Sequence, residues 1–272
     1  MKILLAGIQD NSKSQEIIKY LSKSKMGVLY SALNEKRKID KYRLKNFLFV
    51  DSGAHSWNKL TIQNFGHKGK KELPDPIKFY EEYANYIQNN ADKNYTFVEL
   101  DIYAVLKKDI LDDFYKQIKK IKGNFKFIRV YHPIIDNGDL SELKKWVKQG
   151  QDYIGIGNDS TPILNNVFSI TRDKIKFHGF AMTNKGLLEK YPFYTCDSTT
   201  WLVGSIYAGY WSNKKHTGIS KKFLIKNKKL DIIKTVQSEN TYDINLRWVK
   251  GMENMQNYIT KLWKYKGVEW NE

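Results

Sequence analysis

Short apolar segments rich in β-branched and aromatic residues recur along the chain, and longer polar–apolar patterns separate them. Eight of these segments have the length and composition of buried strands. They are residues 3–8, 28–31, 47–51, 96–102, 125–132, 153–157, 174–181 and 193–197. Strand-like segments that alternate with helices are typical of a parallel sheet, because each parallel pairing needs a crossover connection.

The segments between the strands carry the helical period. Asp75 and Pro76 form a cap followed by proline at the first helical position, and apolar residues then recur at helical spacing to Ile87. Further helical patterns cover 110–121, 143–147 and 161–170. We therefore predict an α/β fold, a (β/α)8 TIM barrel. An open doubly wound sheet is the rival fold, but it usually has a glycine-rich turn after its first strand, and here Gly7 stands alone.

The strand–helix alternation stops after Trp201. Residues 211–235 hold eight lysines against one acidic residue, Asp231, and a helix with one apolar face follows. This change predicts two parts: a barrel domain over residues 1–210, and a short basic appendage over residues 211–272 that packs on the barrel.

Composition limits the class of protein and its partners. The chain has 272 residues, of which 41% are hydrophobic and 14% aromatic, so it has ample material for a core and is not a disordered chain. Its 46 basic and 29 acidic residues give a formal charge of +17, which favours a polyanionic partner; a lysine-rich surface that only aids solubility is the alternative. No segment approaches the roughly 20 apolar residues of a membrane span, so we expect no membrane insertion and a cytoplasmic protein.

Candidate chemistry collects after the predicted strands. In parallel barrels, catalytic groups lie at the carboxyl ends of the strands. Asp51, Asp101 and Asp197 stand there on three different strands, and His132 and His178 on two others. A single aspartate after a strand is more often a helix cap or a turn former. Three that face one mouth favour a catalytic site.

The motifs around these residues carry a family resemblance. The chain reads DSGAHS at 51–56, LDI at 100–102, YHP at 131–133, IGIG at 154–157, HGFAMT at 178–183 and CDSTTW at 196–201. In their order and strand-end context, over about residues 45–202, these motifs resemble those of the tRNA-guanine transglycosylases (queuine tRNA-ribosyltransferases). DSGA is closest to the variant in the phage relatives that insert 7-deazaguanines into DNA. The resemblance implies exchange of guanine in DNA for a free 7-deazaguanine base of the preQ0 type.

The resemblance also implies roles for the three aspartates. Asp197 matches the nucleophile, and a carboxylate can form and then leave a covalent glycosyl-enzyme. Asp51 fits the general acid and base that moves protons to the departing base and from the incoming one. Asp101 stands where the family reads guanine, whose N1–H and amino group need an acceptor-only partner.

The remaining base-binding residues follow from the same comparison. Donors to the O6 atom of guanine are expected from Ser52, His132 or the backbone of Gly155 and Gly157. Two histidines stand where the family has side chains that cover the two faces of the base. These are His55 and His178.

The region after the nucleophile departs from the family. The tRNA enzymes carry a zinc site of three cysteines and a histidine there, whereas this chain has lysines and a single cysteine, Cys196, expected to be a small buried residue. We therefore predict no metal site and no cofactor. The lysines expected to track a phosphate backbone are Lys214, Lys215, Lys221 and Lys222. The expected partners are DNA, or alternatively tRNA, and a free base; a homodimer or a phage or host partner protein stays open.

Three alternatives stay open from the sequence. The first is a divergent tRNA-guanine transglycosylase with the same chemistry. The second is a metal-dependent hydrolase that uses His132, His178 and Asp197, although the first strand lacks the usual His-x-His pair. The third is a non-catalytic nucleic-acid-binding barrel, which would not need carboxylates that repel phosphate at its mouth.

Overall fold

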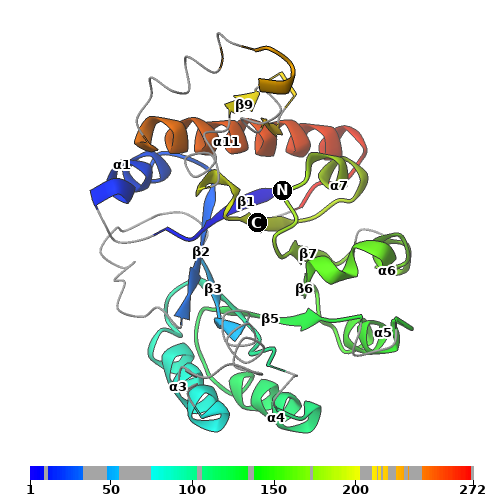
Figure 1. Cartoon of the computed structure of the whole chain (residues 1–272). Helices are drawn as coiled ribbons and strands as arrows, with labels where there is room; N and C mark the ends of the chain where they lie inside the picture. The colour runs from blue at the N-terminus through cyan, green and yellow to red at the C-terminus, as the bar shows by residue number, and fades with distance from the viewer. Residues whose placement is uncertain are drawn as a thin grey trace, which may run out of the picture.

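The central feature of the computed structural model is a closed barrel of eight parallel strands in chain order, in which β8 pairs with β1 (Figure 1). The strands are β1 (Lys2–Ala6), β2 (Gly27–Ser31), β3 (Leu48–Asp51), β4 (Tyr95–Val98), β5 (Lys126–Tyr131), β6 (Tyr153–Ile156), β7 (Lys176–Gly179) and β8 (Thr195–Ser198). The predicted TIM barrel is confirmed. The structure describes residues 1–8, 12–32, 48–54, 75–102, 106–133, 138–171, 174–202, 210–212, 214–215, 217–219, 225–229, 232 and 241–270.

Helices surround the barrel. They are α1 (Ser12–Leu21), α3 (Pro76–Asn89), α4 (Lys108–Ile118), α5 (Ser141–Lys148), α6 (Leu164–Thr171), α7 (Lys185–Lys190) and α11 (Thr241–Tyr265). The predicted cap of α3 is confirmed, because the Asp75 carboxylate accepts the N–H groups of Ile77 and Lys78 at 2.9 Å. The helix expected from residue 161 begins later, since Pro162 lies in the 3-10 helix η3 (Asn158–Ile163). None of the helices among the described residues is long and apolar enough to cross a bilayer.

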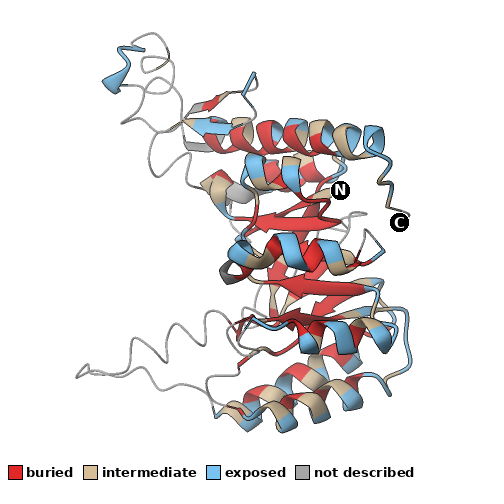
Figure 2. Cartoon of the chain, turned by 90° about the vertical axis from the view of Figure 1, so that its right-hand side faces the viewer, coloured by how far each residue is buried: buried red, intermediate tan, exposed pale blue. Residues whose placement is uncertain are grey.

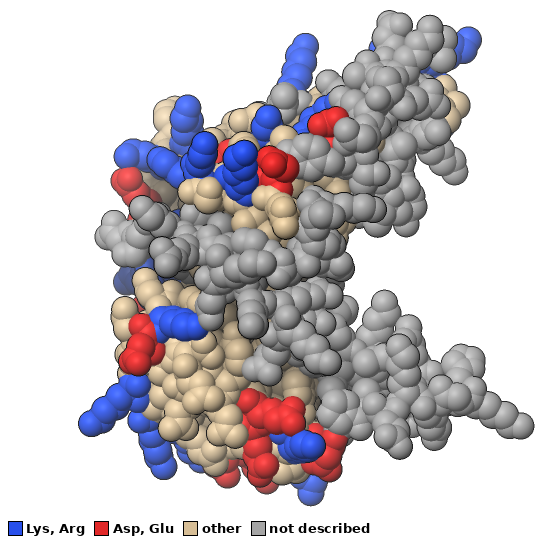
Figure 3. All heavy atoms as spheres, turned by 90° about the vertical axis from the view of Figure 1, so that its left-hand side faces the viewer, with Lys and Arg blue, Asp and Glu red and all other residues tan. Residues whose placement is uncertain are grey.

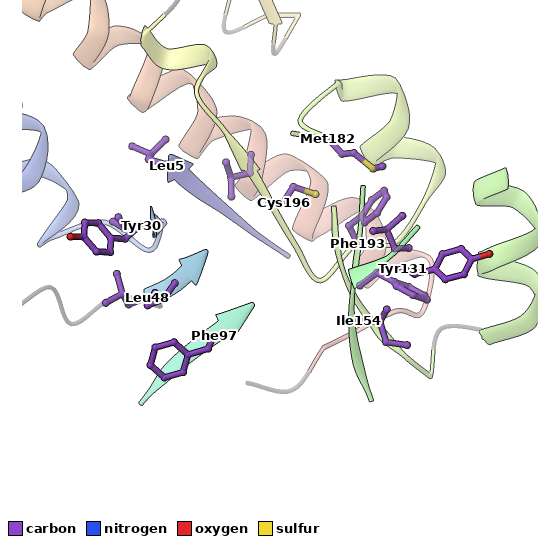
Figure 4. Close-up of a cluster of buried hydrophobic side chains, with 14 of the residues drawn as sticks. Leu5, Tyr30, Leu48, Phe97, Tyr131, Ile154, Met182, Phe193 and Cys196 are labelled. Atoms are coloured by element: carbon purple, nitrogen blue, oxygen red, sulfur yellow. The ribbon is translucent and has the colours of Figure 1, made fainter. Parts of the chain in front are cut away.

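The alternation of side chains along the strands creates two separate cores. A small inner cluster includes Leu4, Phe49 and Tyr153 and fills the barrel. The larger cluster lies between the strands and the helices, and its side chains point away from the barrel axis, as those of Leu5 and Phe97 do (Figure 4). Figure 2 shows that the strands and the inward faces of the helices are buried. The inner cluster therefore forms the floor beneath the barrel mouth.

The C-terminal helix α11 is part of the barrel wall. It lies beside β1, between α1 and α7 (Figure 1). The Gln256 side chain accepts the backbone N–H of Ile3 at 2.6 Å, and the Tyr258 hydroxyl donates to Glu189 of α7 at 2.7 Å. This helix covers the strands where the last helix of a TIM barrel belongs. The C-terminal residues therefore pack on the barrel, and the division at residue 210 stays a prediction.

A two-stranded antiparallel hairpin, β9 (Tyr210–Ser212) and β10 (Thr217–Ile219), sits on α11. Its packing is reciprocal, because each partner supplies a tryptophan that lies on a glycine of the other. A Cβ atom at Gly251 would lie 2.1 Å from the Trp211 ring, and one at Gly218 would lie 2.1 Å from the Trp248 ring. Neither glycine can be replaced without moving a buried indole, so the hairpin has a fixed position on α11.

Candidate active site

Three aspartates from separate strands meet at the mouth of the barrel. Asp51 is the last residue of β3, Asp101 follows β4 by three residues, and Asp197 lies in β8. The negative charges of Asp101 and Asp197 both raise the pKa of Asp51, so the three carboxylates share one electrostatic environment. The structure therefore brings together the aspartates that the sequence singled out.

Asp51 has the most perturbed environment of the three. Burial is the largest cause that raises the pKa of Asp51, to about 7, followed by the charges of Asp101 and Asp197. Backbone N–H groups of Gly53 and Ser52 act in the opposite direction. They reach the carboxylate because Gly53 adopts a φ of 89°, which turns the chain sharply after the strand. At neutral pH this group populates both its acid and base forms, as proton transfer requires.

Asp101 is paired with His132. The Asp101 Oδ2 atom lies 3.0 Å from His132 Nε2, and the two side chains are 19% and 22% exposed. The predicted strand at 96–102 ends at Val98, so Asp101 belongs to the following loop, where it can reach across to the end of β5. A carboxylate acceptor and an imidazole thus stand side by side at the mouth.

Asp197 is held through one of its carboxylate oxygens. Its Oδ1 atom accepts the backbone N–H of Ala181 at 2.8 Å and lies 3.4 Å from His178 Nε2. Ala181 has a φ of 54°, a left-handed conformation that is strained for a residue other than glycine. Among the described residues, Oδ2 has no hydrogen-bond partner, and the side chain keeps 12% of its surface exposed. One oxygen is therefore fixed by the protein, and the other is without a partner in the part of the chain that the structure describes.

His178 lies below the mouth and cannot cover a base there. Its ring is fully buried in the barrel, stacked on Phe49 at 4.2 Å between centroids and met edge-on by Phe180 at 4.3 Å. Burial lowers the pKa of His178, so its imidazole is neutral at pH 7. The expectation that His178 contacts the base is wrong for this arrangement, because the strand alternation directs the ring into the inner core.

Two other residues expected to contact the base, Ser52 and Gly155, are also directed away from the mouth. Ser52 is fully buried, and its hydroxyl accepts the N–H of Ala54 at 3.3 Å, so it shapes the turn. Gly155 lies within β6, paired with Val130 and His178, and its backbone belongs to the sheet.

Gly157 remains a candidate for a backbone contact, because it follows β6 at the mouth and is half-buried. His55 lies outside the described residues. The structure adds Ser31, which ends β2 directly opposite Asp51 and has a buried hydroxyl without a hydrogen-bond partner among the described residues. Its position at the carboxyl end of the predicted strand 28–31 was the signal that the sequence offered for it.

The hairpin lies beside the mouth. A cavity of about 320 Å³ lies between the hairpin and the loop after β7. Its lining includes Ala181, Thr200, Trp211 and Thr217. Lys214 and Lys215 are exposed in the turn of the hairpin. Two further lysines expected to bind phosphate lie outside the described residues, namely Lys221 and Lys222. On the face that Figure 3 shows, both basic and acidic side chains occur on the described surface.

The metal-dependent hydrolase considered above would use His132, His178 and Asp197 as ligands, but these residues belong to two separate pairs. His132 lies against Asp101, and His178 against Asp197. In the part of the chain that the structure describes, no three His, Cys, Asp or Glu side chains are grouped so that they could hold a metal ion. Cys196 is buried as expected, and burial raises the pKa of its thiol far above the usual range.

A scan against models of known protein families gave no match, and a search of curated proteins gave none either. The resemblance to the transglycosylases therefore stays a prediction from the motifs. A functional conclusion has to come from the geometry of the mouth.

Proposed function

We propose that this protein is a base-exchange transglycosylase that acts on nucleic acid. The observation that supports this best is the pairing of two unlike carboxylates at one mouth. Asp51 has a pKa of about 7, whereas Asp197 has one oxygen fixed by the Ala181 N–H and the other available. Retaining glycosyl transfer needs these two roles, a proton carrier and a carboxylate nucleophile.

The proposed reaction has two balanced steps. Oδ2 of Asp197 forms a bond to C1′ of the target nucleoside while the C1′–N9 bond breaks, and the departing guanine takes a proton from the acid form of Asp51. The incoming base then gives its N9 proton to the ionised Asp51 and attacks C1′, which releases Asp197. The target nucleotide has to be flipped out of the duplex, or be unpaired, for C1′ to reach the barrel.

The Asp101–His132 pair fits recognition of the base. Guanine presents N1–H and an amino group as donors beside the O6 acceptor, and a carboxylate next to an imidazole complements that edge. We infer that Asp101 accepts from the donors and that His132, 3.0 Å from Asp101 Oδ2, orients that carboxylate. A 7-deazaguanine has the same edge, so both bases would bind.

The polymer is proposed to be DNA, and a free 7-deazaguanine base the second substrate. The DSGA motif and the absence of the cysteine-rich segment favour DNA over tRNA. The exposed Lys214 and Lys215, on a hairpin next to the mouth, supply charge where a phosphate chain would pass. The divergent tRNA enzyme and the non-catalytic binder become outcomes of the test.

The test offers labelled guanine and 7-deazaguanine with duplex DNA, single-stranded DNA and tRNA in parallel. Wild type is expected to incorporate label into DNA, Asp197→Asn to lose exchange, and Asp92→Asn, an exposed control, to keep it. Incorporation into tRNA alone would show that the polymer substrate is tRNA and would leave the proposed reaction unchanged. Binding of all three polymers with no exchange would favour the non-catalytic barrel and overturn the proposal.

A further inference from the structure

A chain of polar side chains crosses the apolar interior of the barrel and ends at Asp197. The Tyr153 hydroxyl lies 2.6 Å from Thr195 Oγ1, and this oxygen lies 2.8 Å from His178 Nδ1. On its other side, His178 Nε2 faces Asp197 Oδ1 at 3.4 Å. All four residues are more than nine-tenths buried. Such groups are costly to bury unless they satisfy one another, so their alignment calls for an explanation.

The protons in this chain can be assigned from its surroundings. Burial raises the pKa of Tyr153 well above its usual range, so Tyr153 keeps its proton and donates it to Thr195. The Thr195 hydroxyl then donates its single proton to His178 Nδ1. The neutral imidazole must therefore carry its own proton on Nε2, the atom that faces Asp197. The opposite tautomer would place a lone pair against a carboxylate oxygen. Thr195 Oγ1 would then accept from both Tyr153 and His178, and the Thr195 proton would have no acceptor among the described residues.

The ring that carries this proton is firmly held. Phe49 stacks on one face of His178, and Phe180 meets it edge-on. Phe180 is followed by Ala181, whose N–H binds the same Oδ1 atom at 2.8 Å. One N–H group, from a strained turn, thus binds Oδ1 of Asp197, and the buried ring nitrogen of His178 faces the same oxygen at 3.4 Å with no hydrogen-bond partner among the described residues.

We propose that His178, with its proton placed by Thr195 and Tyr153, is a positioning residue for the nucleophile Asp197. This inference rests on the proposed function. Oδ1 is bound by the Ala181 N–H, and the Nε2 atom of His178 faces the same oxygen at 3.4 Å, so that a proton on Nε2 holds the carboxylate plane and leaves Oδ2 as the oxygen that attacks C1′. The same two donors stabilise the carboxylate when it leaves the glycosyl-enzyme in the second step, because Oδ1 then regains negative charge.

Substitution of Thr195 tests this role without disturbing the shape of the core. Thr195→Val is nearly isosteric and removes the proton that fixes the imidazole tautomer, whereas Thr195→Ser keeps it. We expect Thr195→Val to lower kcat for base exchange at least 10-fold with KM for both substrates unchanged, and Thr195→Ser to stay within about 3-fold of wild type. His178→Gln keeps a donor near the position of Nε2 but loses the contact with Thr195. Its kcat should lie between those of Thr195→Val and Asp197→Asn. Equal kcat in Thr195→Val and wild type would overturn the inference.

A second measurement does not depend on activity. In wild type, ¹⁵N NMR of the labelled imidazoles should show the Nε2–H tautomer for His178, and in Thr195→Val the Nδ1 resonance should move to that of a nitrogen that accepts no hydrogen bond. An Nδ1–H tautomer in wild type would contradict the inference even if exchange is observed. If wild type exchanges no base, the proposed function fails, and the tautomer still decides whether His178 donates to Asp197.

Discussion

Gly155 and Phe180 share one space inside the barrel. A Cβ atom at residue 155 would lie 2.7 Å from Cε2 of Phe180 and 3.3 Å from the carbonyl oxygen of Arg129. The absence of a side chain in β6 therefore lets Phe180 pack into the barrel and meet the ring of His178. A glycine expected to contact the substrate base instead serves the packing below the site.

Gly155→Ala should therefore displace Phe180 and disturb His178 and Asp197 together. Overpacking of this kind lowers the free energy of unfolding by about 1–3 kcal/mol. Urea unfolding and kcat for exchange measure the two effects. The double variant Gly155→Ala/Phe180→Leu should recover part of the loss, because leucine vacates the space that the new methyl group needs. Additive effects of the two substitutions would show that they do not share that space.

The raised pKa of Asp51 predicts a pH-dependent stability. Because the pKa of about 7 in the folded state exceeds the ordinary aspartate value of 3.8, the folded protein binds more protons than the unfolded chain between these values. Stability is therefore lost as pH rises from about 4 through 7. Asp51→Asn mimics the neutral form and should raise Tm relative to wild type more at pH 8 than at pH 5. Asp92→Asn, on the exposed surface, is the control, and an equal gain at both pH values would argue against the raised pKa.

Proton transfer by Asp51 predicts a matching kinetic profile. The dependence of kcat/KM on pH should show an inflection near 7 in wild type. In Asp51→Asn the inflection should disappear, and kcat/KM should fall by several orders of magnitude. Mass spectrometry of that variant with nucleic acid should still detect a glycosyl-enzyme on Asp197. Wild-type activity in Asp51→Asn would require another residue as the proton carrier.

Asp101 is expected to act through base affinity. Asp101→Ala leaves two guanine donors without an acceptor, and affinity for the free base should fall at least about 100-fold. Asp101→Asn keeps the size of the side chain but turns its amide NH₂ group toward an N–H donor of guanine. Its affinity for the free base should therefore fall nearly as far. Equilibrium dialysis with labelled guanine measures both, and affinity for DNA without a target site should stay constant. Unaltered base binding would assign the Asp101–His132 pair to structure alone.

The hairpin lysines are expected to bind phosphate. Replacing Lys214 and Lys215 by glutamine should weaken DNA binding and reduce its salt dependence by about one to two units of slope, with kcat at saturation unchanged. Lys120 and Lys122, exposed after α4 at the opposite end of the barrel, provide a matched pair of control substitutions. Equal losses from the two pairs would mean that overall charge, rather than the hairpin, attracts the polymer.

The role of α11 predicts that the barrel cannot fold without its last residues. Gln256→Ala leaves the buried N–H of Ile3 without an acceptor, which should lower the free energy of unfolding by about 1–3 kcal/mol. Asn257→Ala, exposed on the same helix, should have little effect. A chain that ends at residue 240 should fail to give a cooperative unfolding transition. A stable, cooperative 1–240 fragment would instead support the division into barrel and appendage.

The sequence by itself determined the eight strands, their parallel order and the position of the three aspartates. These features depend on local patterns, because a strand's apolar run and the residue at its carboxyl end are read over a few positions. Parallel closure then brings all such ends to one mouth. Asp51, Asp101 and Asp197 could therefore be selected before their surroundings were known.

Only the tertiary structure decided the fate of residues whose environment comes from distant parts of the chain. The helix that completes the barrel does so through contacts such as Ile3 with Gln256, which are 253 positions apart. His178 and Gly155 have strand-end motifs like those of true mouth residues, yet Phe49 and Phe180 enclose them in the inner core. The raised pKa of Asp51 likewise arises from burial and from two charges on other strands. The burial of a side chain and the electrostatic potential at it depend on all of its neighbours in space. Many of those neighbours are distant in sequence, so a local sequence pattern does not reveal them.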